Sequence, residues 1–351
     1  MEVKFSDFKI IPVLDSIKRA DISDEEYFSK KYRSYISNSR LRNIDPNKGG
    51  TPELYRNPPT FSTSSLKLGS SIHELLLQPD SFCLAPKMNR PSAKLGDVVE
   101  KTYYYVKDGM DQIEAIRKAC IEVSYYVNNI DRKIPFIIEK GTPYWNALEE
   151  PRSRKVGVEE IFLSDNDHDV VTKCLESCFN NEQIMSKLHP TDVFGNPVES
   201  YNEIAFFIDF IVTYKNKQCA NLKFKMKADN YTVDTDGKLI TLNDLKTTGH
   251  PVTMFMNEEW GSMSHYSYYR QMYLYSWVLW LYCTQQYGAS KNTGWTMKSN
   301  MLVVQTFPDF SSRCFSVGNN WLKKGKREGE ELLKRVAAYE IFGWDSEIDF
   351  I

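Results

Sequence analysis

The stretch from Leu222 to Thr248 constrains the fold most strongly, because it predicts two β-strands joined by a turn. Its first half alternates in type, with Leu222, Phe224, Met226 and Ala228 in an apolar set and Lys223, Lys225, Lys227 and Asp229 in a charged set. A period of two is typical of a strand, so we expect one core face and one basic face that ends in a carboxylate. Asp236-Gly237 supplies turn chemistry between the two strands.

In the second strand the same alternation places Asp244 and Lys246 on one side, with Ile240 and Leu242. Two carboxylates followed by a lysine suit phosphodiester hydrolysis. Carboxylate oxygens hold a hard divalent cation, which lowers the pKa of a bound water and neutralises phosphate charge. An ammonium group can then orient the water or stabilise the charged transition state. Asp229, Asp244 and Lys246 alone are equally compatible with an exposed hairpin that carries a surface ion pair.

Composition limits where nucleic acid could bind. The chain has 351 residues, 42% of them apolar and 26% charged, as in soluble globular proteins. Its net charge is only -2, so a nucleic-acid surface must be a local basic patch, such as residues 30–42 or 323–327. The odd number of cysteines, seven, without a secretory signal predicts reduced thiols and a cytoplasmic location. No apolar run is long enough to cross a bilayer, so we expect no membrane partner.

The first 24 residues fit an edge strand or a packed arm, and a helix is predicted from Ser23, with a second start at Ser37. Ser37, Ser39 and Arg40 together offer hydroxyl and guanidinium groups that can bind a phosphate. The alternative is plain capping by Ser37 with Arg40 in solvent. Residues 45–65 are rich in Pro, Gly, Asn, Ser and Thr and predict a loop.

A buried helix is predicted over 66–77, and its apolar spacing carries His73 toward the interior, as a hydrogen-bonded core residue or a metal ligand. Further helices are predicted over 111–128 and 165–188, within a helical section near 100–190. The run that begins at Glu203 predicts a central strand, with Glu203 either near the metal or solvated at the strand end.

A long helix is predicted from Ser264 to the glycine at 288. Gln271 and Tyr275 lie four residues apart and so share a helix face, where they can hydrogen-bond a phosphate, a base edge or a carboxylate of the metal site. Arg270 could add a charge contact to DNA. The simpler alternative for Tyr275 is that its ring is half-buried without a functional contact. With a strand at 301–307 and a helix at 318–342, these elements predict an α/β fold with a central sheet flanked by helices.

Six segments carry a resemblance to a known family: ISNSRL at 36–41, LKLGSSIHELLLQPDSF at 66–82, the Glu203 strand, KMKAD ending at Asp229, DLKTT at 244–248 and QMYLY at 271–275. In order and wording they resemble the PD-(D/E)XK nuclease superfamily, most closely its exodeoxyribonuclease VIII (RecE-like) and lambda-type exonuclease branch. The resemblance covers roughly residues 30–340. It implies a restriction-endonuclease-like core with a mixed sheet, and a division into a helical segment with a front loop at 1–65 and a single nuclease domain at 66–345.

The resemblance also implies roles for individual residues. The metal ligands would be His73, Asp229, Asp244 and the backbone carbonyl of Leu245. Lys246 would be the catalytic lysine, Glu203 a supporting acid, and Gln271 and Tyr275 the QxxxY pair. Ser37, Ser39 and Arg40 fall where relatives bind the DNA end. The second carboxylate is Asp rather than the Glu of some relatives. Only Cys283 and Cys314 follow the QxxxY motif, so no iron–sulfur cluster is expected.

The implied activity is that of a Mg²⁺-dependent deoxyribonuclease, with Mn²⁺ able to substitute. The branch further implies 5′ to 3′ exonuclease action on double-stranded DNA ends in phage-type recombination or repair, a ring-shaped homo-oligomer and a single-strand annealing protein as partner. Two alternatives remain open: a structure-specific or single-strand nuclease on the same core, and a DNA-binding module with a vestigial nuclease site.

Overall fold

The computed structural model describes residues 1–59, 64–150 and 156–351, which form two compact units. The first unit combines Met1–Phe61 with Ser177–Ile351, and the second is Ser62–Glu176. The predicted segments 1–65 and 66–345 stay a prediction; in the structure the amino-terminal segment supplies a strand of the sheet, and Ser62–Glu176 is a unit of its own. Residues 60–63 of the predicted front loop and 151–155 of the predicted helical section lie outside the described residues.

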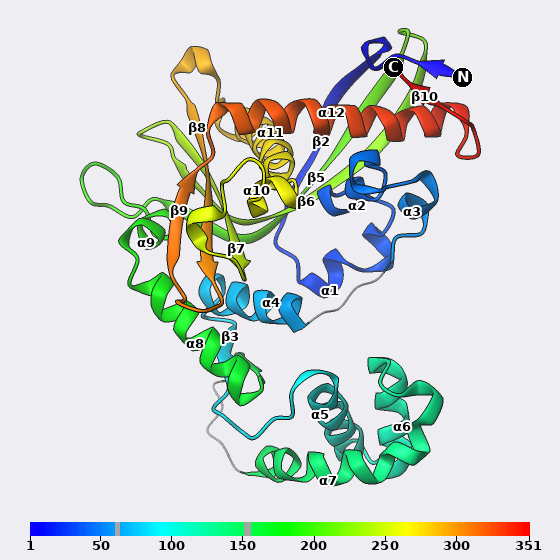
Figure 1. The fold of residues 1–351 in the computed structure, drawn as a ribbon. Coiled ribbons are helices and arrows are strands. Elements are labelled where there is room, and N and C mark those ends of the chain that lie inside the picture. The colour runs from blue at the N-terminus through cyan, green and yellow to red at the C-terminus, as the bar shows by residue number, and fades with distance from the viewer. Residues whose placement is uncertain (60–63, 151–155) are drawn as a thin grey trace. The chain divides into compact units, whose positions relative to one another are not determined.

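The first unit is built on a six-stranded sheet (Figure 1). Its strands, in spatial order, are β2 (Phe8–Ala20), β5 (Glu199–Tyr214), β6 (Gln218–Asp234), β7 (Leu239–Thr248), β8 (Thr296–Gln305) and β9 (Ser312–Ser316). β7 and β8 are parallel and the other neighbours are antiparallel. The predicted fold class, a mixed central sheet flanked by helices, is therefore confirmed.

Two long helices, α11 (Tyr268–Tyr287) and α12 (Asn319–Phe342), pack over one face of this sheet and enclose the main apolar core (Figure 1). α11 ends at Gly288 with φ +65°, as predicted. The two helices approach closely at Gly325, where an added Cβ would meet the Tyr269 carbonyl oxygen at 2.2 Å. Only glycine fits at such a crossing.

The opposite face of the sheet carries a smaller cluster made by Tyr27, Ala205 and Phe207. Tyr27 ends α1 (Asp24–Tyr27), whose predicted cap is confirmed, since the Ser23 hydroxyl accepts a hydrogen bond from Glu26 N. The predicted second start at Ser37 is confirmed, since Ser37 caps α2 (Asn38–Arg42). The helix predicted from Ser23 is shorter than expected, because α1 is followed by the separate turn η2 (Lys30–Tyr32). Of the two alternatives for the first residues, the edge strand is observed, as β2.

The remaining elements of the first unit are short. They are β1 (Glu2–Val3), η1 (Phe5–Asp7), η3 (Pro46–Lys48), α3 (Pro52–Arg56), α9 (Glu182–Leu188), η5 (Val252–Met254), α10 (Ser262–His265), η6 (Lys291–Thr293) and β10 (Asp349–Phe350). The predicted loop at 45–65 thus contains two helical turns. β1 and β10 pair in parallel, so the two ends of the chain lie side by side (Figure 1).

The alternation predicted for β6 holds only in its first half. The even-numbered residues Leu222, Phe224, Met226 and Ala228 face the core. Tyr231 and Val233 belong to the same core, so odd-numbered residues face it from Tyr231 onward. On β5 the residue across from this change is Glu203, with φ +54°. The predicted basic face is also partly wrong, because Lys225 is only 6% exposed and its ammonium donates to the Tyr27 carbonyl at 2.7 Å.

The second unit is mainly helical, as predicted. It contains α4 (Ser64–Leu77), β3 (Phe82–Leu84), α5 (Ala93–Lys107), α6 (Gln112–Val123), η4 (Val127–Asn129), α7 (Ile130–Glu149), β4 (Glu159–Ile161) and the start of α8 (Asp165–Phe179). An apolar core joins α5, α6 and α7, and β3 pairs with β4 in parallel. Across the described residues of both units, every helix is too short or too polar to cross a membrane.

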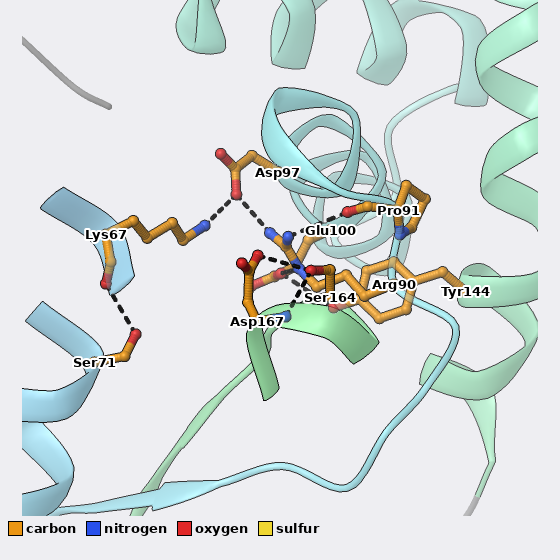
Figure 2. Close-up of polar contacts among 9 residues, drawn as sticks. All are labelled: Lys67, Ser71, Arg90, Pro91, Asp97, Glu100, Tyr144, Ser164 and Asp167. Atoms are coloured by element: carbon orange, nitrogen blue, oxygen red, sulfur yellow. Dashed lines mark hydrogen bonds and ion pairs between the residues drawn. The ribbon is translucent and has the colours of Figure 1, made fainter. Parts of the chain in front are cut away.

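Figure 2 shows a polar network that holds α4, α5 and α7 of this unit together. The Arg90 side chain is 4% exposed and pairs with Asp97 at 2.5 Å and Glu100 at 3.3 Å. Lys67 of α4 shares Asp97, and the Tyr144 hydroxyl of α7 donates to Glu100 at 3.1 Å. Burial opposes ionisation of Asp97, but the bonds to Lys67 and Arg90 outweigh it and lower the pKa of that carboxyl.

Candidate active site

The three residues Asp229, Asp244 and Lys246 meet where β6 and β7 stop pairing. The last pair of that ladder is Asn230 with Asn243, so the next residues, Asp229 and Asp244, lie across from each other. The Lys246 Nζ atom is 2.5 Å from Asp244 Oδ2 and 3.9 Å from Asp229 Oδ2. Asp244 is 1% exposed, so this is an enclosed ion pair and not the surface pair that the sequence also allowed.

Hydrogen bonds fix the orientation of both carboxylates. Leu245 N donates to Asp229 Oδ2 at 2.8 Å, and Gln271 Nε2 of α11 donates to Asp244 Oδ1 at 2.7 Å. The Lys246 ammonium donates to the Leu245 carbonyl oxygen at 3.1 Å. Of the three partners predicted for Gln271, the carboxylate is the one observed.

A third acid joins these two from the neighbouring strand. The β5–β6 register pairs Asn202 with Asn230 and Ile204 with Ala228, which leaves Glu203 across from Asp229. Their carboxylate oxygens lie within 4.8 Å of each other. Three neighbouring strands therefore each contribute one acid at the same level of the sheet, a set of oxygen donors that suits a hard divalent cation.

Two lysines balance this negative charge. Lys227 contacts Glu203 at 3.1 Å and Asp24 at 2.5 Å. For Lys246, burial favours the neutral amine, but Asp244 and Asp229 outweigh burial and raise the pKa above its ordinary value. Lys246 is thus a protonated cation at neutral pH, suited to stabilise negative charge rather than to accept a proton.

Tyr275 lies one helical turn beyond Gln271 on α11 and is buried. Burial, and after it the phenol of Tyr27 and the charges of Asp244 and Asp229, raises its pKa well above the ordinary value. Tyr275 is therefore a neutral phenol beside the acids. Tyr268 lies one helical turn before Gln271, and its ring centroid is 5.2 Å from Lys246 Nζ.

A row of asparagine side chains, buried except for the half-buried Asn202, crosses the sheet immediately beside the acids. The Asn243 amide donates to Asn230 Oδ1 at 2.7 Å and to the Lys187 carbonyl at 3.1 Å, and Asn300 Nδ2 donates to Asn243 Oδ1 at 2.8 Å. Asn230 Nδ2 continues the row to Asn202 Oδ1 at 2.7 Å. This asparagine row, Asn202, Asn230, Asn243 and Asn300, fixes the register of β5 to β8 and hence the positions of Glu203, Asp229 and Asp244.

The predicted phosphate-binding residues near the first helices make mostly local contacts. Ser37 caps α2 by accepting from Arg40 N at 3.2 Å, and its hydroxyl lies 2.9 Å from that of Ser39. The Arg40 guanidinium donates to the Arg33 carbonyl at 2.8 Å and lies 4.6 Å from the Tyr55 ring centroid. Capping by Ser37 is as the simpler alternative predicted, but Arg40 is packed on Tyr55 and not free in solvent.

The position of Arg270 argues against the predicted contact with DNA. Its side chain is 1% exposed and binds Asp45 at 2.8 Å and Asn38 Oδ1 at 3.0 Å. Arg270 links α11 to the segment around α2. Its guanidinium could contact a ligand only if the buried ion pair with Asp45 were broken. The sequence carries no signal for this pair, because its two charges are far apart along the chain.

His73 lies on α4 in the second unit, half-buried, and its role as a metal ligand stays a prediction. Sequence reasoning missed the asparagine row, the contact of Tyr268 with Lys246, and the pairing of Lys227 with Glu203 and Asp24. The asparagines at 230, 243 and 300 each lie in a strand, where Asn is rare, and this was the signal available.

No known sequence family matches the chain, and no curated protein is similar to it in sequence. Among solved structures, a similar chain is a protein from Eubacterium rectale described as a putative exonuclease. The identity is 12% and the TM-score 0.44, over 93% of this chain and 89% of that chain. Function must therefore be argued from the site itself.

Proposed function

We propose that this chain is a divalent-metal-dependent nuclease that hydrolyses phosphodiester bonds in DNA. The observation that carries the proposal is the enclosed group of Asp229, Asp244 and Lys246, in which two carboxylates from facing strands share one protonated lysine. Such a group combines oxygen ligands for a cation with a fixed positive charge, the two elements that phosphate hydrolysis requires.

The residues present fit Mg²⁺, with Mn²⁺ as a substitute. Asp229, Asp244 and the Leu245 carbonyl would hold the ion, with Glu203 as the supporting acid on β5. His73 is proposed as a further ligand on the strength of its sequence motif. The bound ion would lower the pKa of a water molecule and neutralise charge on the phosphate.

The chain's own residues complete the proposed mechanism. Lys246, held protonated by its two aspartates, places an ammonium where negative charge develops on the phosphate. Gln271 donates a hydrogen bond to Oδ1 of Asp244 and so holds the other carboxylate oxygen, Oδ2, toward Lys246. The neutral phenol of Tyr275 adds a buried dipole near both acids.

The finer assignment rests on the sequence motifs. They support 5′ to 3′ exonuclease action on double-stranded ends in phage-type recombination or repair, by a ring-shaped homo-oligomer that works with a single-strand annealing protein. The odd number of cysteines supports a cytoplasmic location. Ser37, Ser39 and Arg40 are proposed to lie near the DNA end. A structure-specific or single-strand nuclease is the main alternative, and a DNA-binding module with a vestigial site is the other.

Activity on labelled DNA tests the proposal. With Mg²⁺, wild-type protein is expected to release nucleotide from 5′-labelled linear duplex before 3′-labelled duplex, and to leave closed circles intact. Lys246→Ala should lower kcat at least ~100-fold, the typical loss for one electrostatic group in a transition state. Lys217→Ala, at an exposed lysine of the same unit, is the control. Unchanged activity in Lys246→Ala contradicts the site, and cleavage of circles contradicts the exonuclease assignment.

The metal is tested separately by calorimetric titration with Mn²⁺. Asp229→Ala, Asp244→Ala and His73→Ala should each weaken binding, whereas His250→Ala, at an exposed histidine, should not. If the wild type binds DNA but neither cuts it nor binds Mn²⁺, the vestigial module is the correct reading. Circular dichroism of each variant confirms that the fold is retained.

A further inference from the structure

A continuous series of ring contacts leads from the proposed catalytic lysine to the surface. Lys246 Nζ lies 5.2 Å from the ring centroid of Tyr268, and the Tyr268 and Tyr266 rings are 5.4 Å apart and tilted by 33°. Tyr266 in turn meets the His265 ring edge-on, at 4.6 Å and 89°. Tyr268 is half-buried, but Tyr266 is 42% exposed and His265 is also exposed, so the series ends in open aromatic surface.

The turn that carries Tyr266 is held in place from several sides. Tyr266 N donates to the Ser262 carbonyl at 3.0 Å, and Lys48 Nζ donates to the His265 carbonyl at 2.9 Å. The next residue, Ser267, is 1% exposed and has φ +56°, a left-handed conformation unusual for serine. Backbone held in such a conformation is typical of functional sites, because the surrounding packing must maintain it.

Two lysines lie along this series of rings. The Lys48 ammonium donates to the His265 carbonyl oxygen, and the Lys246 ammonium contacts the Tyr268 ring. The Lys246–Tyr268 and Tyr268–Tyr266 contacts, of 5.2 and 5.4 Å, place the Lys246 ammonium and the Tyr266 ring at most about three rises of 3.4 Å apart along one DNA strand. A strand whose phosphate is at Lys246 can therefore bring a neighbouring base to Tyr266. Aromatic rings interleaved with cations bind single-stranded nucleic acid, because bases stack on the rings while cations contact phosphates.

We propose that Tyr266, edged by His265, is a stacking subsite for an unpaired nucleobase one to three nucleotides from the phosphate that is cut. This inference rests on the proposed nuclease function and adds a specific contact to it. Stacking is insensitive to base identity, since every base has an aromatic face, so the subsite positions the strand without selecting a sequence. It is a binding contact: Tyr266→Ala should raise KM and leave kcat largely unchanged.

The test is binding of a fluorescein-labelled single-stranded oligonucleotide in EDTA, where metal-dependent cleavage cannot occur, followed by anisotropy. Tyr266→Ala should weaken the Kd roughly 5- to 150-fold, which corresponds to about 1–3 kcal/mol for one stacked base. Tyr266→Phe keeps the ring and should bind within about 2-fold of wild type. Phe194→Ala removes another exposed aromatic of the same unit, 85% exposed, and should have no effect.

Oligonucleotides with one abasic position locate the stacked base. One position should weaken wild-type binding as much as Tyr266→Ala does, and the two changes together should cost no more than either alone, because both remove the same contact. Additive effects, or wild-type affinity in Tyr266→Ala, overturn the subsite. If wild type cuts DNA while Tyr266→Ala binds normally, only this inference fails. If the Tyr266 effects appear but wild type never cuts DNA, the proposed function fails and the stacking contact stands.

Discussion

Replacement of Asn243 by alanine measures how much the sheet depends on the asparagine row beside the acids. Asn243 is fully buried and makes three hydrogen bonds, to Asn230 Oδ1, to the Lys187 carbonyl and from Asn300 Nδ2. Alanine removes all three and leaves the buried amide groups of Asn230 and Asn300 facing an empty space. A buried polar group that loses its partner costs about 1–3 kcal/mol.

With two such groups, and without full additivity, the expected loss in free energy of unfolding is about 2–5 kcal/mol. That is a large fraction of the roughly 5–15 kcal/mol of an ordinary domain. Asn243→Asp keeps the shape but places an oxygen against Asn230 Oδ1, so its loss should be at least as large. Asn221→Ala, at an exposed asparagine on β6, should change stability by less than ~0.5 kcal/mol.

Urea unfolding followed by circular dichroism should show a midpoint lower by about 1 M for Asn243→Ala, taking a slope near 3 kcal/mol per M. Because the chain has two units, native-state hydrogen exchange of peptides from β6 to β8 identifies the unit that is weakened. If the urea midpoint of Asn243→Ala falls no further than that of Asn221→Ala, the asparagine row does not stabilise the register of the sheet.

Two other substitutions follow from packing and burial. Gly325→Ala should lower the free energy of unfolding by about 2 kcal/mol or more despite the better helix propensity of alanine, since its Cβ would meet the Tyr269 carbonyl oxygen at 2.2 Å. Gly318→Ala is the control, because a Cβ there meets nothing within 4 Å. Thermal melting compares the two variants, and equal melting temperatures refute the close approach. Burial, and to a smaller extent Arg40, lowers the pKa of Lys225 to about 8. Between about pH 8 and pH 10.4 the unfolded chain therefore keeps a proton on Lys225 that the folded chain has lost. The free energy of unfolding should rise with pH across this range, by at most about 3 kcal/mol. Lys225→Met should remove that rise in urea titrations at pH 7 and pH 10, and an unchanged rise contradicts a buried ammonium.

Local patterns predicted the strands and most helices, because period and capping depend on neighbouring residues. The grouping of Asp244 with Lys246 followed from alternation within one strand. The change of core-facing side after Ala228 could not be predicted in this way, since it accompanies a positive φ at Glu203 that no local pattern signals. Alternation placed Asp229 on the lysine face of β6, and in the structure Asp229 lies beside both the acid Glu203 and Lys246.

Long-range partners were the second gap. Arg270 was predicted to contact DNA because a charged residue next to Gln271 suggested a ligand, but its partner Asp45 is 225 residues away in sequence. The asparagine row likewise depends on the registers of four strands at once, which no single segment encodes. Chemistry carried by residues within a few positions was predictable. Across the fold, the contact of Gln271 with a carboxylate was predicted, whereas the partner of Arg270 and the asparagine row were not.

The edge strand β2 has a consequence for how the chain is made. Phe8 pairs with Tyr214 of β5, so β2 leaves the ribosome long before its partner exists. At about 5–20 residues per second, the intervening stretch of about 200 residues takes roughly 10–40 s to synthesise. The helical unit, Ser62–Glu176, is complete within that interval and can fold first. Until β5 emerges, β2 is an unpaired strand that a chaperone or a neighbouring nascent chain could bind.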